Sequence, residues 1–256
     1  MSDLSSKNIE TSYVLIATGR DYHQLAKKLI KSLILINMKN TQVILFTDNP
    51  AFFLDQAPGI DIISIENLKW PEATYLRYEI IFKNFSEITG TVIVYLDVDS
   101  IINRNPKFDL EFLKSANLFF VRHPGYFKRD PIRWVIHRTL TSPWETGRKF
   151  TCYVPLWKRR VYVFGAIWGG RRNDVRDLCE KLMEMTNIDV SQRNFPRSYD
   201  ESYLNYFVGH IKNHLILDPE YAFVPEFEWI NRRYADPYII FEAKKPEINA
   251  SKKPLS

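Results

Sequence analysis

Cysteine is scarce in this chain of 256 residues, which contains only Cys152 and Cys179. Two cysteines cannot build a disulfide framework, and their spacing does not match that of metal ligands. The sequence therefore argues against a disulfide-stapled fold and a cysteine-based metal centre. We expect both thiols to be buried and reduced.

Long apolar runs are also absent. The longest, such as Leu29 to Ile36, is interrupted by Lys31 and is far shorter than the roughly 20 residues that a membrane span requires. The first residues, Met1 to Glu10, are polar and lack the apolar core of a signal peptide. We therefore expect a cytoplasmic protein without a transmembrane segment, for which a weak peripheral membrane contact stays open.

Neither sign of charge dominates. The chain has 35 Lys and Arg against 30 Asp and Glu, a net charge of +5. This mild bias fits an anionic substrate, an anionic lipid or a nucleic acid about equally well. No nucleic-acid-binding motif accompanies it, so we expect no nucleic-acid partner. Hydrophobic residues, at 45%, suffice for a full core.

The first hundred residues alternate between strand-like and helix-like patterns. Short apolar runs predict strands at 13–17, 43–46, 60–65 and 91–96, and apolar residues at helical spacing predict helices at 22–35 and 71–85. Such alternation is typical of a mostly parallel sheet flanked by helices, an α/β fold. Ligands of such sheets bind beyond the carboxyl ends of the strands.

The second half is less regular. The segment 122–160 interleaves Lys and Arg with aromatic residues without a clear period, which favours a long basic loop with some helix. We expect a strand at 162–168 that ends at Gly169 and Gly170, helices at 174–185 and from Asp200, and short strands at 215–217 and 223–224. We predict one domain over residues 11–245, between a disordered terminus (1–10) and a flexible basic tail (246–256).

The acidic triplet Asp97-Val98-Asp99 follows the strand predicted at 91–96. In an extended chain its two carboxylates share a face while Val98 points toward the core. Two hard oxygen ligands suit Mn²⁺ or Mg²⁺, which complete their shells with phosphates and water. A pair of surface aspartates in a turn is the alternative.

Two further motifs are ambiguous when taken alone. Asp200-Glu201-Ser202 opens a predicted helix, where acidic residues also occur as ordinary N-terminal caps. The run from Gly165 to Gly170 lets a ligand approach the backbone closely, but a strand that ends in a glycine turn explains it equally well.

Taken together and in order, these segments resemble glycosyltransferase family six, the group of the histo-blood-group A and B transferases and α-1,3-galactosyltransferase. The likeness runs from about Tyr13 to Lys245. It rests on four runs: Leu96 to Asp99, Gly165 to Gly170, Asp200 to Asn205, and Asp218 to Tyr221.

The resemblance implies a single-domain nucleotide-sugar transferase (GT-A) fold. It also implies UDP-galactose or UDP-N-acetylgalactosamine as donor, a galactoside-containing glycan as acceptor, and α-1,3 transfer with retention of the anomeric configuration. Asp97 and Asp99 would bind the cation, and Glu201 would be the nucleophile or the stabiliser of the oxocarbenium-like transition state. The resemblance places these further residues at the donor: Ala17, Thr18, Tyr22, Arg77, Val98, Gly165, Ala166, Asp200 and Lys244. It places His123 and Tyr199 at the acceptor.

The chain also departs from the family pattern. Ser198 and Tyr199 replace a Trp-His pair, and Val224 replaces an acceptor-binding aspartate. We expect a protein of the bacterial or viral type, without the membrane anchor of the animal members. Bacterial members often carry asparagines in the acidic box, whereas this chain keeps both aspartates.

Two alternative functions stay open. One is a retaining UDP-hexose transferase of the glycogenin or lipopolysaccharide-galactosyltransferase type. The other is a non-enzymatic module that binds nucleic acid or membrane through residues 122–160, although the sequence shows no basic amphipathic helix there.

Overall fold

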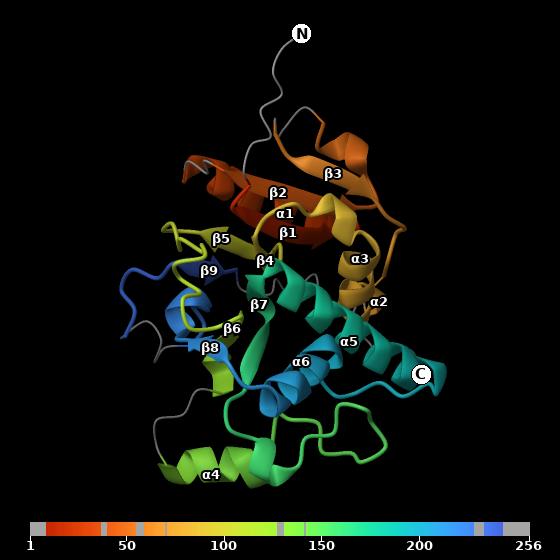
Figure 1. The fold of residues 1–256 in the computed structure, drawn as a ribbon, viewed down its shortest axis with the longest axis vertical. Coiled ribbons are helices and arrows are strands. Elements are labelled where there is room, and N and C mark those ends of the chain that lie inside the picture. The colour runs from red at the N-terminus through yellow and green to blue at the C-terminus, as the bar shows by residue number, and fades with distance from the viewer. Residues whose placement is uncertain are drawn as a thin grey trace.

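The computed structural model describes residues 9–36, 40–54, 59–69, 71–126, 131–140, 142–227 and 233–242. They form a central seven-stranded sheet with helices on both faces (Figure 1). This confirms the predicted α/β fold. The predicted C-terminal tail and all but two residues of the predicted N-terminal segment lie outside the described residues.

The sheet has the strand order β3-β2-β1-β4-β7-β6-β8. The strands are β1 (Thr11–Ala17), β2 (Thr41–Thr47), β3 (Asp61–Ser64), β4 (Val92–Leu96), β6 (Leu118–Arg122), β7 (Val163–Arg171) and β8 (His214–Leu217). β1 is parallel to β2 and β4, β2 is parallel to β3, and β6 is parallel to β8. Only β7 runs antiparallel to its neighbours, β4 and β6. The sheet is therefore mostly parallel, as predicted.

The helices that cover the sheet are α1 (Arg20–Leu35), α2 (Glu72–Tyr75), α3 (Arg77–Lys83), α5 (Arg172–Ser191) and α6 (Tyr199–His210). Alternate strand residues face opposite layers. Tyr13 and Leu15 pack in the core that contains α1, whereas Val14 and Tyr95 pack in the core that contains α3, α5 and α6. Because both faces are covered, the central strands are nearly continuous apolar runs, which is why the sequence predicts them well.

The helix predicted at 71–85 is two helices in the structure. α2 ends at Tyr75 and α3 begins at Arg77, with Leu76 between them at φ −85° and ψ −3°. The break between the two helices lies next to Arg77, whose guanidinium is held by groups on other elements. Tertiary contacts therefore interrupt a stretch whose local pattern is continuous.

The prediction that a strand ends at Gly169 and Gly170 is wrong, because β7 continues through both glycines to Arg171. A Cβ at Gly169 would lie 2.2 Å from the carbonyl oxygen of Ile93, and one at Gly170 would lie 2.3 Å from that of Asn117. The glycines therefore allow close strand packing rather than a turn.

Three of the described strands were not predicted: β6, and the two short strands β5 (Ser100–Ile102) and β9 (Ile239–Phe241), which pair with each other. A run of three residues is too short to show the alternation of apolar and polar residues that predicts a strand. The predicted strand at 223–224 is only an isolated bridge between Phe223 and Ile240.

The basic segment 122–160 contains one longer helix, α4 (Pro131–Thr139), which lies at the end of the molecule opposite β3 (Figure 1). Both cysteines are buried and free, as predicted. Within the described ranges, no helix has the length and apolar character needed to cross a membrane.

Candidate active site

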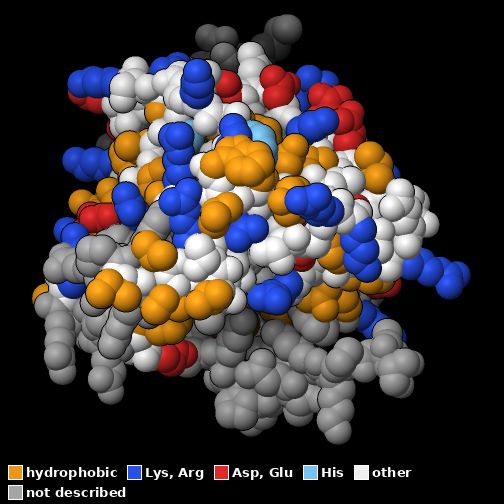
Figure 2. All heavy atoms as spheres, turned by 90° about the horizontal axis from the view of Figure 1, so that it is seen from below, with side chains coloured by type: hydrophobic (Ala, Val, Ile, Leu, Met, Phe, Trp, Pro, Cys, Tyr) orange, Lys and Arg blue, Asp and Glu red, His pale blue; other side chains and the backbone are white. Residues whose placement is uncertain are grey.

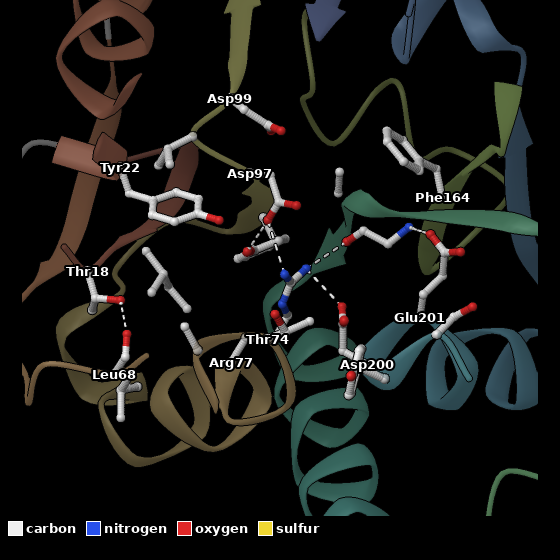
Figure 3. Close-up of a pocket in the computed structure, with 18 of the residues that line it drawn as sticks. Thr18, Tyr22, Leu68, Thr74, Arg77, Asp97, Asp99, Phe164, Asp200 and Glu201 are labelled. Atoms are coloured by element: carbon white, nitrogen blue, oxygen red, sulfur yellow. Dashed lines mark hydrogen bonds and ion pairs between the residues drawn. The ribbon is translucent and has the colours of Figure 1, made fainter. Parts of the chain in front are cut away.

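A cavity of about 500 Å³ lies beyond the carboxyl ends of β1 and β4, between β7 and the start of α6 (Figure 3). Twelve of the residues predicted for the site line it: Thr18, Tyr22, Arg77, Asp97, Val98, Asp99, His123, Gly165, Ala166, Tyr199, Asp200 and Glu201. Ala17 does not line it, since its side chain is buried in the core. Lys244 lies outside the described residues. The roles of all these residues stay predictions.

Arg77 lies at the centre of the site (Figure 3). Its Nη1 is 3.0 Å from Oδ2 of Asp200 and its Nη2 is 3.3 Å from Oδ1 of Asp97. Nη1 also donates to the carbonyl oxygen of Gly165, at 3.1 Å. Burial lowers the pKa of Arg77, but the two carboxylates more than offset this and raise it well above its usual value. The guanidinium is thus a fixed positive charge that ties together α3, β4, β7 and α6.

Asp200 is buried beside Arg77. The pKa of Asp200 is raised to about 7, mainly by burial; the positive charge of Arg77 lowers it, and the nearby charges of Asp97 and Glu201 raise it. Ser198, the residue before α6, forms no side-chain capping bond. Asp200 turns toward the cavity.

Asp97 and Asp99 lie in the turn that joins β4 to β5. The amide of Asp97 donates to the carbonyl oxygen of Ala166, at 2.8 Å, and the hydroxyl of Tyr95 donates to Oδ1 of Asp97. The amide of Glu242 donates to the carbonyl oxygen of Asp99, at 2.7 Å. Both side chains lie on the cavity side of this turn (Figure 3). Burial raises the pKa of Tyr22, and both aspartates raise it further because its ring faces them.

The carboxylates of Asp97 and Asp99 fit a hard divalent cation that takes its remaining ligands from the substrate and from water. Among the described residues, no group of three or more His, Cys, Asp and Glu could hold a metal by itself. Two carboxylates beside an open cavity nevertheless match Mn²⁺ or Mg²⁺, since these ions take few protein ligands and complete their shells with phosphates and water. Arg77 already neutralises part of the charge of Asp97.

Glu201 is anchored to β7. Its Oε2 accepts a hydrogen bond from the amide of Gly165, at 2.8 Å. A Cβ at Gly165 would lie 3.1 Å from Cβ of Glu201 and 3.3 Å from Oε2 of Glu201 and Oδ2 of Asp200. The glycine thus lets both carboxylates approach the strand and face the cavity (Figure 3).

An aromatic cluster borders the cavity beside Glu201. The ring of His123 lies 4.9 Å from that of Phe164, 4.7 Å from that of Tyr126 and 5.7 Å from that of Tyr162. Tyr199, the first residue of α6, has a positive φ of 43°. Such backbone is uncommon outside glycine and occurs often at functional sites. These groups give the cavity a wall on which a sugar face could stack.

Seven cavity-lining residues lie outside the predicted set: Ile16, Leu68, Ala73, Thr74, Tyr95, Phe164 and Ser198. Leu68 accepts a hydrogen bond from the hydroxyl of Thr18, at 2.8 Å. Tyr95 could have been predicted from the sequence, because it lies two residues before Asp97 and therefore on the same face of the strand. Leu68 and Thr74 carry no chemical signal in the sequence, because only the path of the chain brings them to the cavity.

Comparisons with known proteins identify the family. The model of the family described as Glycosyltransferase family 6 matches residues 8–233. The O-antigen biosynthesis glycosyltransferase WbnI of Escherichia coli is 28% identical over 183 residues, which cover 71% of this chain and 74% of the relative. The family match contains both acidic motifs and extends over most of the chain. The protein therefore belongs to glycosyltransferase family 6, as the resemblance implied, and is a glycosyltransferase.

Proposed function

We propose that this glycosyltransferase transfers galactose from UDP-galactose, with UDP-N-acetylgalactosamine as a weaker donor, in α-1,3 linkage and with retention. The proposed acceptor is a galactoside-containing glycan. One observation carries the proposal: Arg77 of α3, Asp97 at the end of β4, and Asp200 and Glu201 of α6 meet at one cavity of about 500 Å³. That volume is typical of sites for ligands of nucleotide-sugar size. The name of the Escherichia coli relative, which refers to O-antigen biosynthesis, supports a role in building a glycan.

In this proposal Asp97 and Asp99 hold the divalent cation, Mn²⁺ before Mg²⁺. When bound, the cation neutralises the charge that develops on the diphosphate leaving group. Arg77 keeps Asp97 in place and adds a positive charge on the leaving-group side of the cavity. Asp200, held by Arg77, presents its carboxyl group to the hydroxyls of the donor sugar.

Glu201 faces the anomeric carbon, where positive charge develops as the bond to the phosphate oxygen breaks. Two retaining routes use it differently. In one, its carboxylate forms a covalent glycosyl intermediate that the acceptor hydroxyl then displaces. In the other, the acceptor hydroxyl attacks from the face that the phosphate leaves and passes its proton to that phosphate, while Glu201 stabilises the cationic sugar. Both routes require the carboxylate that the amide of Gly165 holds in place.

The preference for galactose rests on two residues of the cavity wall. Ala166 and the bulky Phe164 both line the cavity, where a methyl group and a large ring crowd an N-acetyl substituent. Steric selection of this kind is worth only about 1–3 kcal/mol, so we expect measurable transfer from the N-acetylated donor as well.

The direct test measures transfer of radiolabelled sugar from each donor to a panel of β-galactosides, with Mn²⁺ and with excess EDTA. We expect Mn²⁺-dependent transfer, faster from UDP-galactose, and an α-1,3 linkage in the product. A different linkage would favour a transferase of the glycogenin or lipopolysaccharide type. Full activity in EDTA would contradict the metal assignment.

Glu201→Gln tests the role of the carboxylate. Glutamine keeps an oxygen that can accept the hydrogen bond from Gly165 but removes the negative charge. We expect kcat to fall at least about a hundredfold, with UDP affinity nearly unchanged, because the charge acts in the transition state and not on the nucleotide. Glu184→Gln, on the exposed face of α5, is the matched control. Loss of UDP binding in Glu201→Gln would instead assign Glu201 to donor binding.

A further inference from the structure

α4 turns a row of apolar side chains outward. The row follows helical spacing from Ile132 through Val135 and Ile136 to Leu140, just after the helix ends. Ile132 is 72% exposed and Leu140 is 82% exposed. No basic amphipathic helix was predicted in this segment. The structure contains one, and its apolar side faces away from the core.

The row continues onto a neighbouring turn. The guanidinium of Arg138 donates two hydrogen bonds to the carbonyl oxygen of Leu156, at 3.1 and 2.8 Å, and Arg159 donates to that of Arg138, at 3.0 Å. These bonds join α4 to the 3-10 helix Leu156–Lys158, whose Leu156 and Trp157 are also exposed. We define the α4 surface by its six apolar residues: Ile132, Val135, Ile136, Leu140, Leu156 and Trp157. Patches of this kind on an otherwise ordinary surface mark interaction sites.

The charge around the α4 surface is strongly positive. Residues 131–160 contain seven Lys and Arg but a single acid, Glu145, a net charge of +6 in a chain whose total is +5. That acid is buried. Seen from this end of the molecule, hydrophobic side chains gather among Lys and Arg, and the few acidic side chains lie mostly toward the rim (Figure 2).

We propose that the α4 surface docks on an anionic lipid bilayer. A helix with exposed aliphatic residues, beside the exposed Trp157 and surrounded by cations, is typical of elements that lie in the membrane interface. The nine residues of α4 are too few to span a bilayer, so docking leaves the protein on the membrane surface. A symmetric contact with a second copy is disfavoured, because it would bring two clusters of the same positive charge together.

The segment that follows α4 in the chain contacts the residues that lead into the active site. Arg197 donates its Nη1 to the carbonyl oxygen of Ser142, at 3.1 Å, and its amide to Oε2 of Glu145, at 3.0 Å. The next residues, Ser198 and Tyr199, line the cavity. Docking therefore holds the cavity near the bilayer. If the proposed function is right, this position suits an acceptor carried on a lipid.

Flotation with vesicles tests the docking. The full chain is mixed with phosphatidylcholine vesicles, with or without phosphatidylglycerol, at low and high salt. We expect binding only to the anionic vesicles and weaker binding at high salt. The double variant Ile132→Ser, Leu140→Ser should lower partitioning at least about tenfold. The matched control changes Leu35 and Leu54 to Ser, which are 75% and 71% exposed but lie away from α4.

A second pair of variants tests the charge. Lys158→Gln, Arg160→Gln should reduce binding to anionic vesicles, whereas Lys27→Gln, Lys31→Gln on α1 should not. Equal loss in test and control variants, or no binding by the unchanged protein, would overturn the proposal. So would a concentration-dependent dimer in sedimentation experiments that the Ile132 and Leu140 changes abolish, because the surface would then bind a second copy. The assay contains neither donor nor acceptor, so its outcome does not depend on the proposed function.

Discussion

At the scale of single residues, Asp97 and Asp99 differ in the contacts that hold them in place. Asp97 is held by Tyr95 and Arg77, whereas the backbone of Asp99 is fixed through its carbonyl oxygen by Glu242. A substitution at Asp97 therefore disturbs Arg77 as well as the proposed cation. A substitution at Asp99 leaves the contacts of Arg77 intact, so it reports more cleanly on cation binding.

Asp99→Asn should lower Mn²⁺-dependent turnover by at least about a hundredfold, equivalent to roughly 2.7 kcal/mol. Asparagine keeps the shape of the side chain but is a weaker ligand for a hard cation. Steady-state assays over a range of Mn²⁺ concentrations measure the change, with the exposed Asp177→Asn as control. Wild-type turnover and an unchanged Mn²⁺ requirement would remove Asp99 from the metal site.

Asp200 should make the stability of the ligand-free protein depend on pH. Its pKa is about 7 in the folded state, against an ordinary value of 3.8, so between these values the folded protein binds a proton that the unfolded chain does not. The contribution of Asp200 to the free energy of unfolding must then fall as the pH rises from about 4 to 7. Urea unfolding of wild type and Asp200→Asn should show a difference that shrinks at low pH and changes by at least about 1 kcal/mol over this range. A difference that is constant with pH would mean that Asp200 stays ionised.

At the scale of elements, β7 joins the two parts of the sheet and also forms a wall of the site. It pairs with β4 and β6 along its second half, where Gly169 leaves no space for a side chain. Gly165, in its first half, makes room for the two carboxylates of α6. One strand therefore needs glycine for packing at one end and for the site at the other.

Gly169→Ala should destabilise the fold, because its Cβ would overlap the carbonyl oxygen of Ile93 and the ring of Phe119. We expect a loss of about 1–3 kcal/mol or more in the free energy of unfolding, measured with urea. Gly209→Ala is the control: its Cβ would lie 3.2 Å from the nearest atom, in a helix where alanine is favoured. Equal stability of the two variants would show that β7 can move away from β4.

At the scale of the whole molecule, the cavity is formed by β1, α1, α3, β4, β7 and α6, so ligand binding should stabilise the entire fold. With UDP and Mn²⁺ at about a hundred times their dissociation constant, the expected gain is about 2.7 kcal/mol. A thermal-unfolding scan measures it as a rise in Tm. EDTA or Asp99→Asn should remove most of the rise, while Asp177→Asn should not. An equal rise with UDP alone would argue against a cation bridge.

The sequence by itself determined the central strands and the acidic motif. Runs such as 13–17 and 91–96 are continuous and apolar because both faces of the sheet are covered, so local composition carries the signal. The resemblance to the family rested on four runs in order along the chain, Leu96 to Asp99, Gly165 to Gly170, Asp200 to Asn205 and Asp218 to Tyr221, and the family match confirms it. The end of β7 was predicted wrongly, because a glycine pair is as common in turns as in close strand packing.

Only the tertiary structure decided how these residues combine. The contact between Arg77 and Asp200 joins residues 123 positions apart, and the raised pKa of Asp200 comes from burial that no local pattern reveals. β5 and β9 pair with each other although they lie far apart in the chain. The outward face of α4 likewise depends on where the chain places the helix, since an apolar row of the same spacing would serve equally well in a core. The sequence determines which chemical groups the site contains. The pKa values and the exposure of these groups depend on contacts between distant segments, which only the tertiary structure shows.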